Sequence, residues 1–157
     1  MNLIDMIKAE EGFREFVYDD ATGRRLVPGV TLVGHATIGY GWACGINPIT
    51  REEAGVILAS RLHKAENDAA AMLGLPAWER LGEVRQAALT AMVYQLGYHG
   101  VRAFPMMLGA LRSENWSRAH GEAMDSRWAA QSPERAKRVA GMLLTGEWPQ
   151  VDAPLVA

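Results

Sequence analysis

The sequence has little cysteine, little excess charge of either sign and no long apolar stretch, and each shortage excludes a class of protein. Its 157 residues contain one cysteine, Cys44, which excludes an intramolecular disulfide framework and is typical of synthesis in a reducing cytoplasm. The 16 basic and 18 acidic residues leave a net charge of -2 and a pI of about 6.1. This balance argues against a nucleic-acid partner, which favours a clear excess of positive charge.

Signals for membrane insertion, export and metal binding are also missing. The apolar run Ala54–Ala59 is far shorter than the roughly 20 residues that a membrane span needs. The segment Met1–Lys8 has neither the basic start nor the long apolar core of a signal peptide, so we expect no export signal. Cys44 and the four histidines show no metal-ligand spacing, so we expect no bound metal and no cofactor.

The hydrophobic content is ordinary for a globular protein. Hydrophobic residues make up 49% of the sequence, and a chain of this length buries roughly 70% of its unfolded surface. We therefore expect one domain over residues 1–157, and a monomer.

Glycine is unevenly distributed along the chain. Seven of the 16 glycines lie between Gly12 and Gly45, together with Pro28 and several β-branched residues. This composition is typical of short strands and tight turns, so the sequence predicts a small antiparallel sheet within residues 13–46.

Helical periodicity accounts for most of the remaining chain. Six helices are expected, over residues 3–11, 51–73, 83–96, 105–112, 116–124 and 133–143. Thr50 and Glu53 form a capping box at the start of the long helix, and Gly97 is the expected end of the most apolar one, which looks buried on all sides. The predicted fold class is α+β, with a small antiparallel sheet segregated from the helices.

Two carboxylates stand near the start of the glycine-rich region. Glu11 ends the first predicted helix, and Asp20 follows after eight intervening residues. Glycoside hydrolysis uses one protonated carboxyl as an acid and one ionised carboxylate to activate water or to attack. Pairs of acidic residues are also common on protein surfaces, so the spacing alone leaves the choice open.

Neighbouring motifs favour the catalytic interpretation. The relevant segments are Glu11-Gly12, Tyr18-Asp19-Asp20, Thr37-Ile38-Gly39-Tyr40-Gly41, Arg85–Leu89, Met92–Gly97, Ser126-Arg127-Trp128, Ser132–Val139 and Thr145–Trp148. Together they resemble the phage-type lysozymes of glycoside hydrolase family 24, over residues 2–148. The resemblance implies a lysozyme-like fold with a sheet lobe (13–50), a connecting helix (51–73), a helical lobe (1–12 and 74–148) and a tail (149–157).

The resemblance also implies an activity and a set of site residues. The enzyme would be a muramidase that hydrolyses the β-1,4 bond between N-acetylmuramic acid and N-acetylglucosamine in peptidoglycan, with inversion. Its catalytic residues would be Glu11 as the general acid and Asp20 and Thr37 as the residues that hold the attacking water. Inversion implies carboxyl groups on the order of 6.5–9.5 Å apart.

Further residues are expected to support that site. Tyr94, Gln95 and Gly41 are expected at the substrate, and Arg135 is expected to pair with the catalytic Glu11. Tyr94 could instead serve only to pack a core helix, and Gly41 could serve only the backbone geometry of the strand.

Three positions depart from the family pattern. Sixteen residues separate Asp20 from Thr37, far more than in the family's short form, and residues 24–36 look like an enlarged hairpin or loop. Trp42 stands where the short form has a histidine. Met107 and Glu122 replace small polar residues that contact substrate in the family, so we assign no glycan contact to either.

The biological role follows from the resemblance as an expectation. The chain would be an endolysin that stays in the host cytoplasm until lysis and then acts in the periplasm on the cell wall. Without an export signal it would need a separate membrane hole-forming protein. Two alternatives remain: a catalytically silent peptidoglycan-binding module and a lytic transglycosylase.

Overall fold

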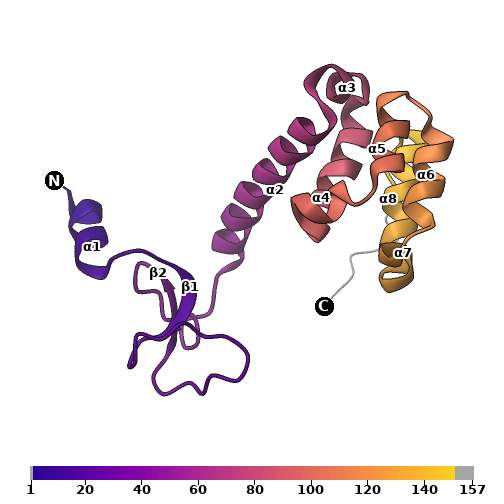
Figure 1. The fold of residues 1–157 in the computed structure, drawn as a ribbon. Coiled ribbons are helices and arrows are strands. Elements are labelled where there is room, and N and C mark those ends of the chain that lie inside the picture. Colours follow the sequence, from indigo (N-terminus) through magenta and orange to yellow (C-terminus); the bar gives the residue numbers. More distant parts are fainter. Residues whose placement is uncertain (1, 151–157) are drawn as a thin grey trace. The chain divides into compact units, whose positions relative to one another are not determined.

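The computed structural model describes residues 2–150 and divides the chain into two compact units, Met1–Gly55 and Val56–Ala157. The first unit holds one short helix and a two-stranded antiparallel sheet, and the second is built of helices (Figure 1). This arrangement confirms the α+β class. Each unit is described by itself below.

The first unit begins with helix α1 (Leu3–Glu11). The Asn2 side chain accepts from the backbone N–H of Asp5, while the Asp5 carboxylate accepts from the backbone N–H of Asn2, a capping box that fixes the start of the helix. The helix ends at Gly12, whose N–H still donates to the Lys8 carbonyl. Glu11 therefore occupies the last helical position, as the sequence predicts.

The sheet of the first unit is smaller than the predicted range of 13–46. It consists of β1 (Arg14–Asp19) and β2 (Ala36–Gly39), paired antiparallel. Tyr18 lies opposite Thr37 and Asp19 opposite Ala36. This register brings the end of β1 beside the start of β2, where Asp20 and Thr37 are found.

The predicted loop over residues 24–36 is held to β1 near both of its ends. Near its start, the N–H of Asp19 donates to the Arg24 carbonyl at 2.9 Å, and the Arg25 guanidinium stacks on the Phe16 ring at 3.4 Å from its centroid. Near its end, the Asp19 carboxylate accepts from the N–H groups of Val33 and Gly34. The enlarged loop is thus an ordered part of the sheet unit.

Helix α2 (Arg51–Leu73) begins just before the boundary between the units. Its predicted capping box is confirmed, because the N–H of Thr50 donates to Glu53 Oε2 at 2.8 Å and the N–H of Glu53 donates to Thr50 Oγ1 at 3.2 Å. The remaining helices are α3 (Leu75–Arg80), α4 (Gly82–Arg102), α5 (Pro105–Arg112), α6 (Trp116–Met124), α7 (Arg127–Gln131) and α8 (Pro133–Thr145).

Three features of the helical unit differ from the prediction. Helices α3 and α7 were not expected, because each is too short to show a clear apolar period. Helix α4 continues past the expected stop at Gly97, where a φ of 74° breaks the helix before it resumes. The burial of α4 is also incomplete: Leu89 and Met92 are fully buried, whereas Tyr94 is 51% exposed.

The hydrophobic core of the described residues lies in the second unit. Its largest fully buried side chains include Leu89, Met92 and Leu143. In the first unit the two buried residues are both polar, Asp19 and Thr37. None of the helices within residues 2–150 has the length and apolar character required to cross a membrane.

Candidate active site

The carboxylate of Glu11 lies directly against the backbone of Gly41. A Cβ atom placed on Gly41 would collide with the carboxylate oxygen Oε2 of Glu11, and Gly41 has a φ of +73°. Both observations require glycine, since other residues carry a Cβ and are strained at that φ. The structure therefore gives Gly41 the role of making room for the Glu11 carboxylate, whereas its predicted contact with substrate stays a prediction.

Tyr40 fixes the end of α1 beside this glycine. Its ring lies 5.3 Å from the Phe13 ring, and the Lys8 ammonium lies 5.6 Å from its centroid. Cation–π and aromatic pairs of this kind add stability beyond their buried area. They hold the helix that carries Glu11 against the segment after β2.

Gly41→Ala should lower the hydrolytic activity that the family resemblance implies on the order of 100-fold, because the new methyl group displaces the Glu11 carboxylate. Gly39→Ala is the matched control, since Gly39 has a φ of +69° but open space at the Cβ position. Both variants bear a similar backbone strain of about 1–2 kcal/mol. Reducing-end release and melting temperature measure the two effects, and equal activity losses in both variants would argue against the displacement of Glu11.

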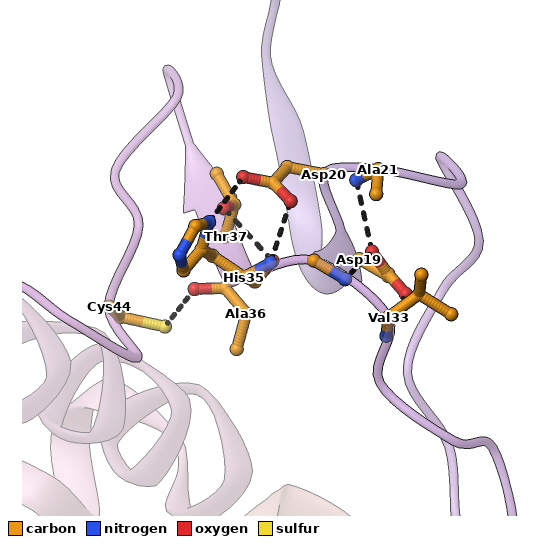
Figure 2. A network of polar contacts seen from close by, with 9 residues as sticks. Asp19, Asp20, Ala21, Val33, His35, Ala36, Thr37 and Cys44 are labelled. Carbon is orange, nitrogen blue, oxygen red and sulfur yellow. Dashed lines mark hydrogen bonds and ion pairs between the residues drawn. The ribbon is translucent and has the colours of Figure 1, made fainter.

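The second carboxylate, Asp20, is held by His35. The backbone N–H of His35 donates to Asp20 Oδ1 at 2.6 Å, and the ring atom Nδ1 of His35 lies 3.2 Å from Asp20 Oδ2 (Figure 2). The N–H of His35 holds the pKa of Asp20 below its ordinary value, against a smaller opposing effect of burial. Asp20 is therefore ionised at neutral pH, as a residue that activates water must be.

The adjacent Asp19 is buried and structural. Its carboxylate accepts from the backbone N–H groups of Ala21, Val33 and Gly34 at 3.0, 2.7 and 3.0 Å (Figure 2). The N–H of Val33 is the main cause of the lowered pKa of Asp19. An ionised carboxylate can be buried when N–H donors replace its water, so this anchor holds the end of the 24–36 loop against β1.

Thr37 is buried in β2, and its hydroxyl Oγ1 donates to the His35 carbonyl at 3.3 Å. The same carbonyl accepts from the N–H of Asp20 at 3.1 Å. His35 is thus hydrogen-bonded to both Asp20 and Thr37. Cys44 holds the start of β2 by donating from Sγ to the Ala36 carbonyl at 3.2 Å (Figure 2).

The other predicted site residues lie in the second unit. Gln95 is fixed, because its Oε1 accepts from Trp128 Nε1 at 3.0 Å and its Nε2 donates to Ser132 Oγ at 3.4 Å. Tyr94 is half exposed and lines a cavity of about 280 Å³. Arg135 is exposed on α8, and its pairing with Glu11 stays a prediction.

A larger cavity of the second unit, about 610 Å³, is bordered by α4, α5, α6 and α7. Its lining includes Met107, Glu122 and Trp128. The sequence assigned no glycan contact to Met107 or Glu122, and both residues border this cavity. Gln95 reaches the cavity only through its hydrogen bond to Trp128.

The sequence interpretation missed the roles of Asp19 and His35. Asp19 stood out only as part of the segment Tyr18-Asp19-Asp20, and His35 only as one of four scattered histidines. The signal that could have found His35 is its position two residues before Thr37, just ahead of the segment Thr37-Ile38-Gly39-Tyr40-Gly41. Among the described residues, no group of three or more acidic, histidine or cysteine side chains is arranged to hold a metal ion.

The first unit thus holds a glutamate at a helix end and an ionised aspartate near a buried threonine on a small sheet, the residue types that glycoside hydrolysis uses. The model of the phage lysozyme family matches residues 8–144. The chain belongs to the phage lysozyme family, and this membership supports a lysozyme-like peptidoglycan hydrolase.

Curated relatives are similar over part of their own length. The pre-baseplate central spike protein Gp5 of Enterobacteria phage T4 is 29% identical over 161 aligned positions, which cover 93% of this chain and 28% of Gp5. Probable T4-type lysozymes 1 and 2 of Dictyostelium discoideum are each 33% identical over 69 positions, 44% of this chain and 41% of each relative. The chain therefore spans less than half the length of these relatives.

Proposed function

We propose that the chain is an N-acetylmuramidase that cleaves the β-1,4 bond between N-acetylmuramic acid and N-acetylglucosamine in peptidoglycan. Glu11 is the general acid that protonates the leaving oxygen, and Asp20 with Thr37 holds the attacking water. The observation that carries the proposal is the link from Asp20 through His35 to Thr37, in which Asp20 is kept ionised.

The hydrogen bonds at this link leave acceptor lone pairs on Thr37 and Asp20 to which a water molecule could donate. The Thr37 hydroxyl gives its proton to the His35 carbonyl, so its oxygen lone pairs are free to accept. Each oxygen of the Asp20 carboxylate also keeps a free lone pair beyond its contact with His35. A water that donates to both residues presents its own lone pair to the sugar.

The proposed stereochemistry is inversion. An inverting enzyme needs space for water between its carboxylates and the sugar, on the order of 6.5–9.5 Å between the two carboxyl groups. Asp20 is engaged by two contacts from His35, which suits a residue that orients water better than one that must attack the sugar itself. Arg135 is proposed to pair with Glu11, and Tyr94, Gln95 and Gly41 to contact the glycan.

Product analysis tests this function. The purified protein should clear outer-membrane-permeabilised Gram-negative cells and release reducing N-acetylmuramic acid ends, with the α-anomer appearing first by NMR. Products with 1,6-anhydro ends would instead identify a lytic transglycosylase. Binding to peptidoglycan without cleavage would identify a silent binding module.

The proposed biological role is that of an endolysin. It would remain in the host cytoplasm until a separate hole-forming protein opens the membrane, and then act on the cell wall. The match to Gp5 favours a second candidate, a lysozyme module of a phage tail device, because it covers 93% of this chain but 28% of Gp5. Fractionation of phage lysates separates the two, since a tail module remains with the particles and an endolysin does not.

A further inference from the structure

His35 contacts the proposed catalytic residues Asp20 and Thr37 through its backbone N–H, its carbonyl and its ring. Its backbone N–H donates to Asp20 Oδ1 at 2.6 Å, its ring Nδ1 lies 3.2 Å from Asp20 Oδ2, and its carbonyl accepts from both the Asp20 N–H and the Thr37 hydroxyl (Figure 2). Both oxygens of the Asp20 carboxylate are thereby engaged by one residue.

The sheet register explains why His35 meets Asp20. Asp19 lies opposite Ala36 in the antiparallel pair, so Asp20 and His35 are the next facing positions, just past the ends of β1 and β2. The buried carboxylate of Asp19 accepts from the N–H groups of Val33 and Gly34, the two residues before His35. The backbone of His35 is therefore fixed independently of its own ring.

The ring contact is the part that depends on the identity of residue 35. An ionised carboxylate only accepts hydrogen bonds, so Nδ1 must carry the proton and donate to Asp20 Oδ2. Without this bond, the backbone N–H of His35 would hold Oδ1 alone, and the carboxylate could rotate about its terminal torsion, which has only a weak preference.

We propose that His35 is a positioning residue for the reaction, whose ring fixes the plane of the Asp20 carboxylate so that its free lone pairs face the attacking water beside Thr37. This inference rests on the proposed muramidase function. In this proposal His35 acts through Asp20 rather than on the sugar or the attacking water directly. Loss of the hydrogen bond from His35 Nδ1 would let the Asp20 carboxylate move, and we expect turnover to fall on the order of tenfold.

The test compares His35→Ala with His35→Asn on soluble, uncross-linked peptidoglycan strands. In His35→Ala, kcat should fall on the order of tenfold with little change in KM, because water orientation is lost and substrate contacts remain. In His35→Asn, most of the kcat should return, because the amide Nδ2 can donate where Nδ1 did. His63→Ala is the matched control, since His63 is exposed and contacts Asn67 on the same helix.

Amide hydrogen exchange at Val33 and Gly34 reports whether the loop anchor survives, and it should be unchanged in both His35 variants. Wild-type kcat in His35→Ala would overturn the inference. A loss that Asn does not restore, that appears in KM alone, or that accompanies faster exchange at Val33 and Gly34 would also overturn it. An inactive wild-type protein would instead remove the proposed muramidase function itself.

Discussion

Glu11→Gln should abolish clearing of permeabilised Gram-negative cells and leave the melting temperature close to that of the wild type. Glutamine keeps the shape of the side chain beside Gly41, but its amide N–H is not acidic enough to transfer a proton to the leaving oxygen. General acid catalysis contributes roughly 100- to 10,000-fold, which is enough to take clearing below detection. Glu11 is exposed at the end of α1, so its replacement should disturb the fold little.

Glu10→Gln provides the matched control for this experiment. Glu10 precedes Glu11 on α1, is exposed, and loses the same charge when it is changed to glutamine. Its clearing rate should stay within about twofold of the wild type, because a surface charge has little effect on the chemistry. Clearing that survives Glu11→Gln, or that falls equally in both variants, would show that Glu11 is not the acid.

Asp20→Ala should remove activity with little loss of stability, whereas Asp19→Ala should loosen the protein. Asp20 is partly exposed, and the hydrogen bonds that its carboxylate accepts within the described residues come from His35, so its loss should affect mainly the proposed attacking water. Asp19 is buried, and its removal leaves the N–H groups of Ala21, Val33 and Gly34 without their acceptor. Clearing rate, melting temperature and amide exchange at Val33 and Gly34 measure the difference.

The two variants serve as controls for each other. Both Asp19→Ala and Asp20→Ala should lose activity, but the first through a loosened loop and the second through loss of the water-holding carboxylate. Asp19→Ala should lower the melting temperature and speed amide exchange at Val33 and Gly34, and its residual activity should vary with temperature as the loop loosens. Asp20→Ala should leave exchange at those amides near the wild-type rate. A stable, inactive Asp19→Ala together with an active Asp20→Ala would show that Asp19 holds the water.

Most helices could be predicted from the sequence because their signals are local. The capping box at Thr50 and Glu53 marks the start of α2, and Gly97 marks the break in α4. The six residues of α3 and the five of α7 carry less than two full turns, too few to show periodicity. The sheet was predicted too large because much of its glycine-rich sequence forms ordered turns held by side chains.

Site residues that belong to a sequence motif could be predicted. Site residues that are brought into place only by tertiary structure could not. Glu11, Asp20 and Thr37 stand at positions of a known pattern, and the structure joins Asp20 to Thr37 through His35. The contact between His35 and Asp20 depends on strand register across fourteen intervening residues at the centre of the glycine-rich segment. Register of that kind follows from the whole pairing of the strands rather than from local composition.

The 24–36 loop is held to β1 near both of its ends, and the segment between these two anchors is free of them. Residues 24–26 pair along β1, and residues 33–35 are held by Asp19 and Asp20, while residues 27–32 between them are mostly exposed. Lengthening a flexible loop costs little, because closure entropy grows only with the logarithm of length. We therefore expect the tip at 27–32 to accept grafted peptides without movement of the proposed water site.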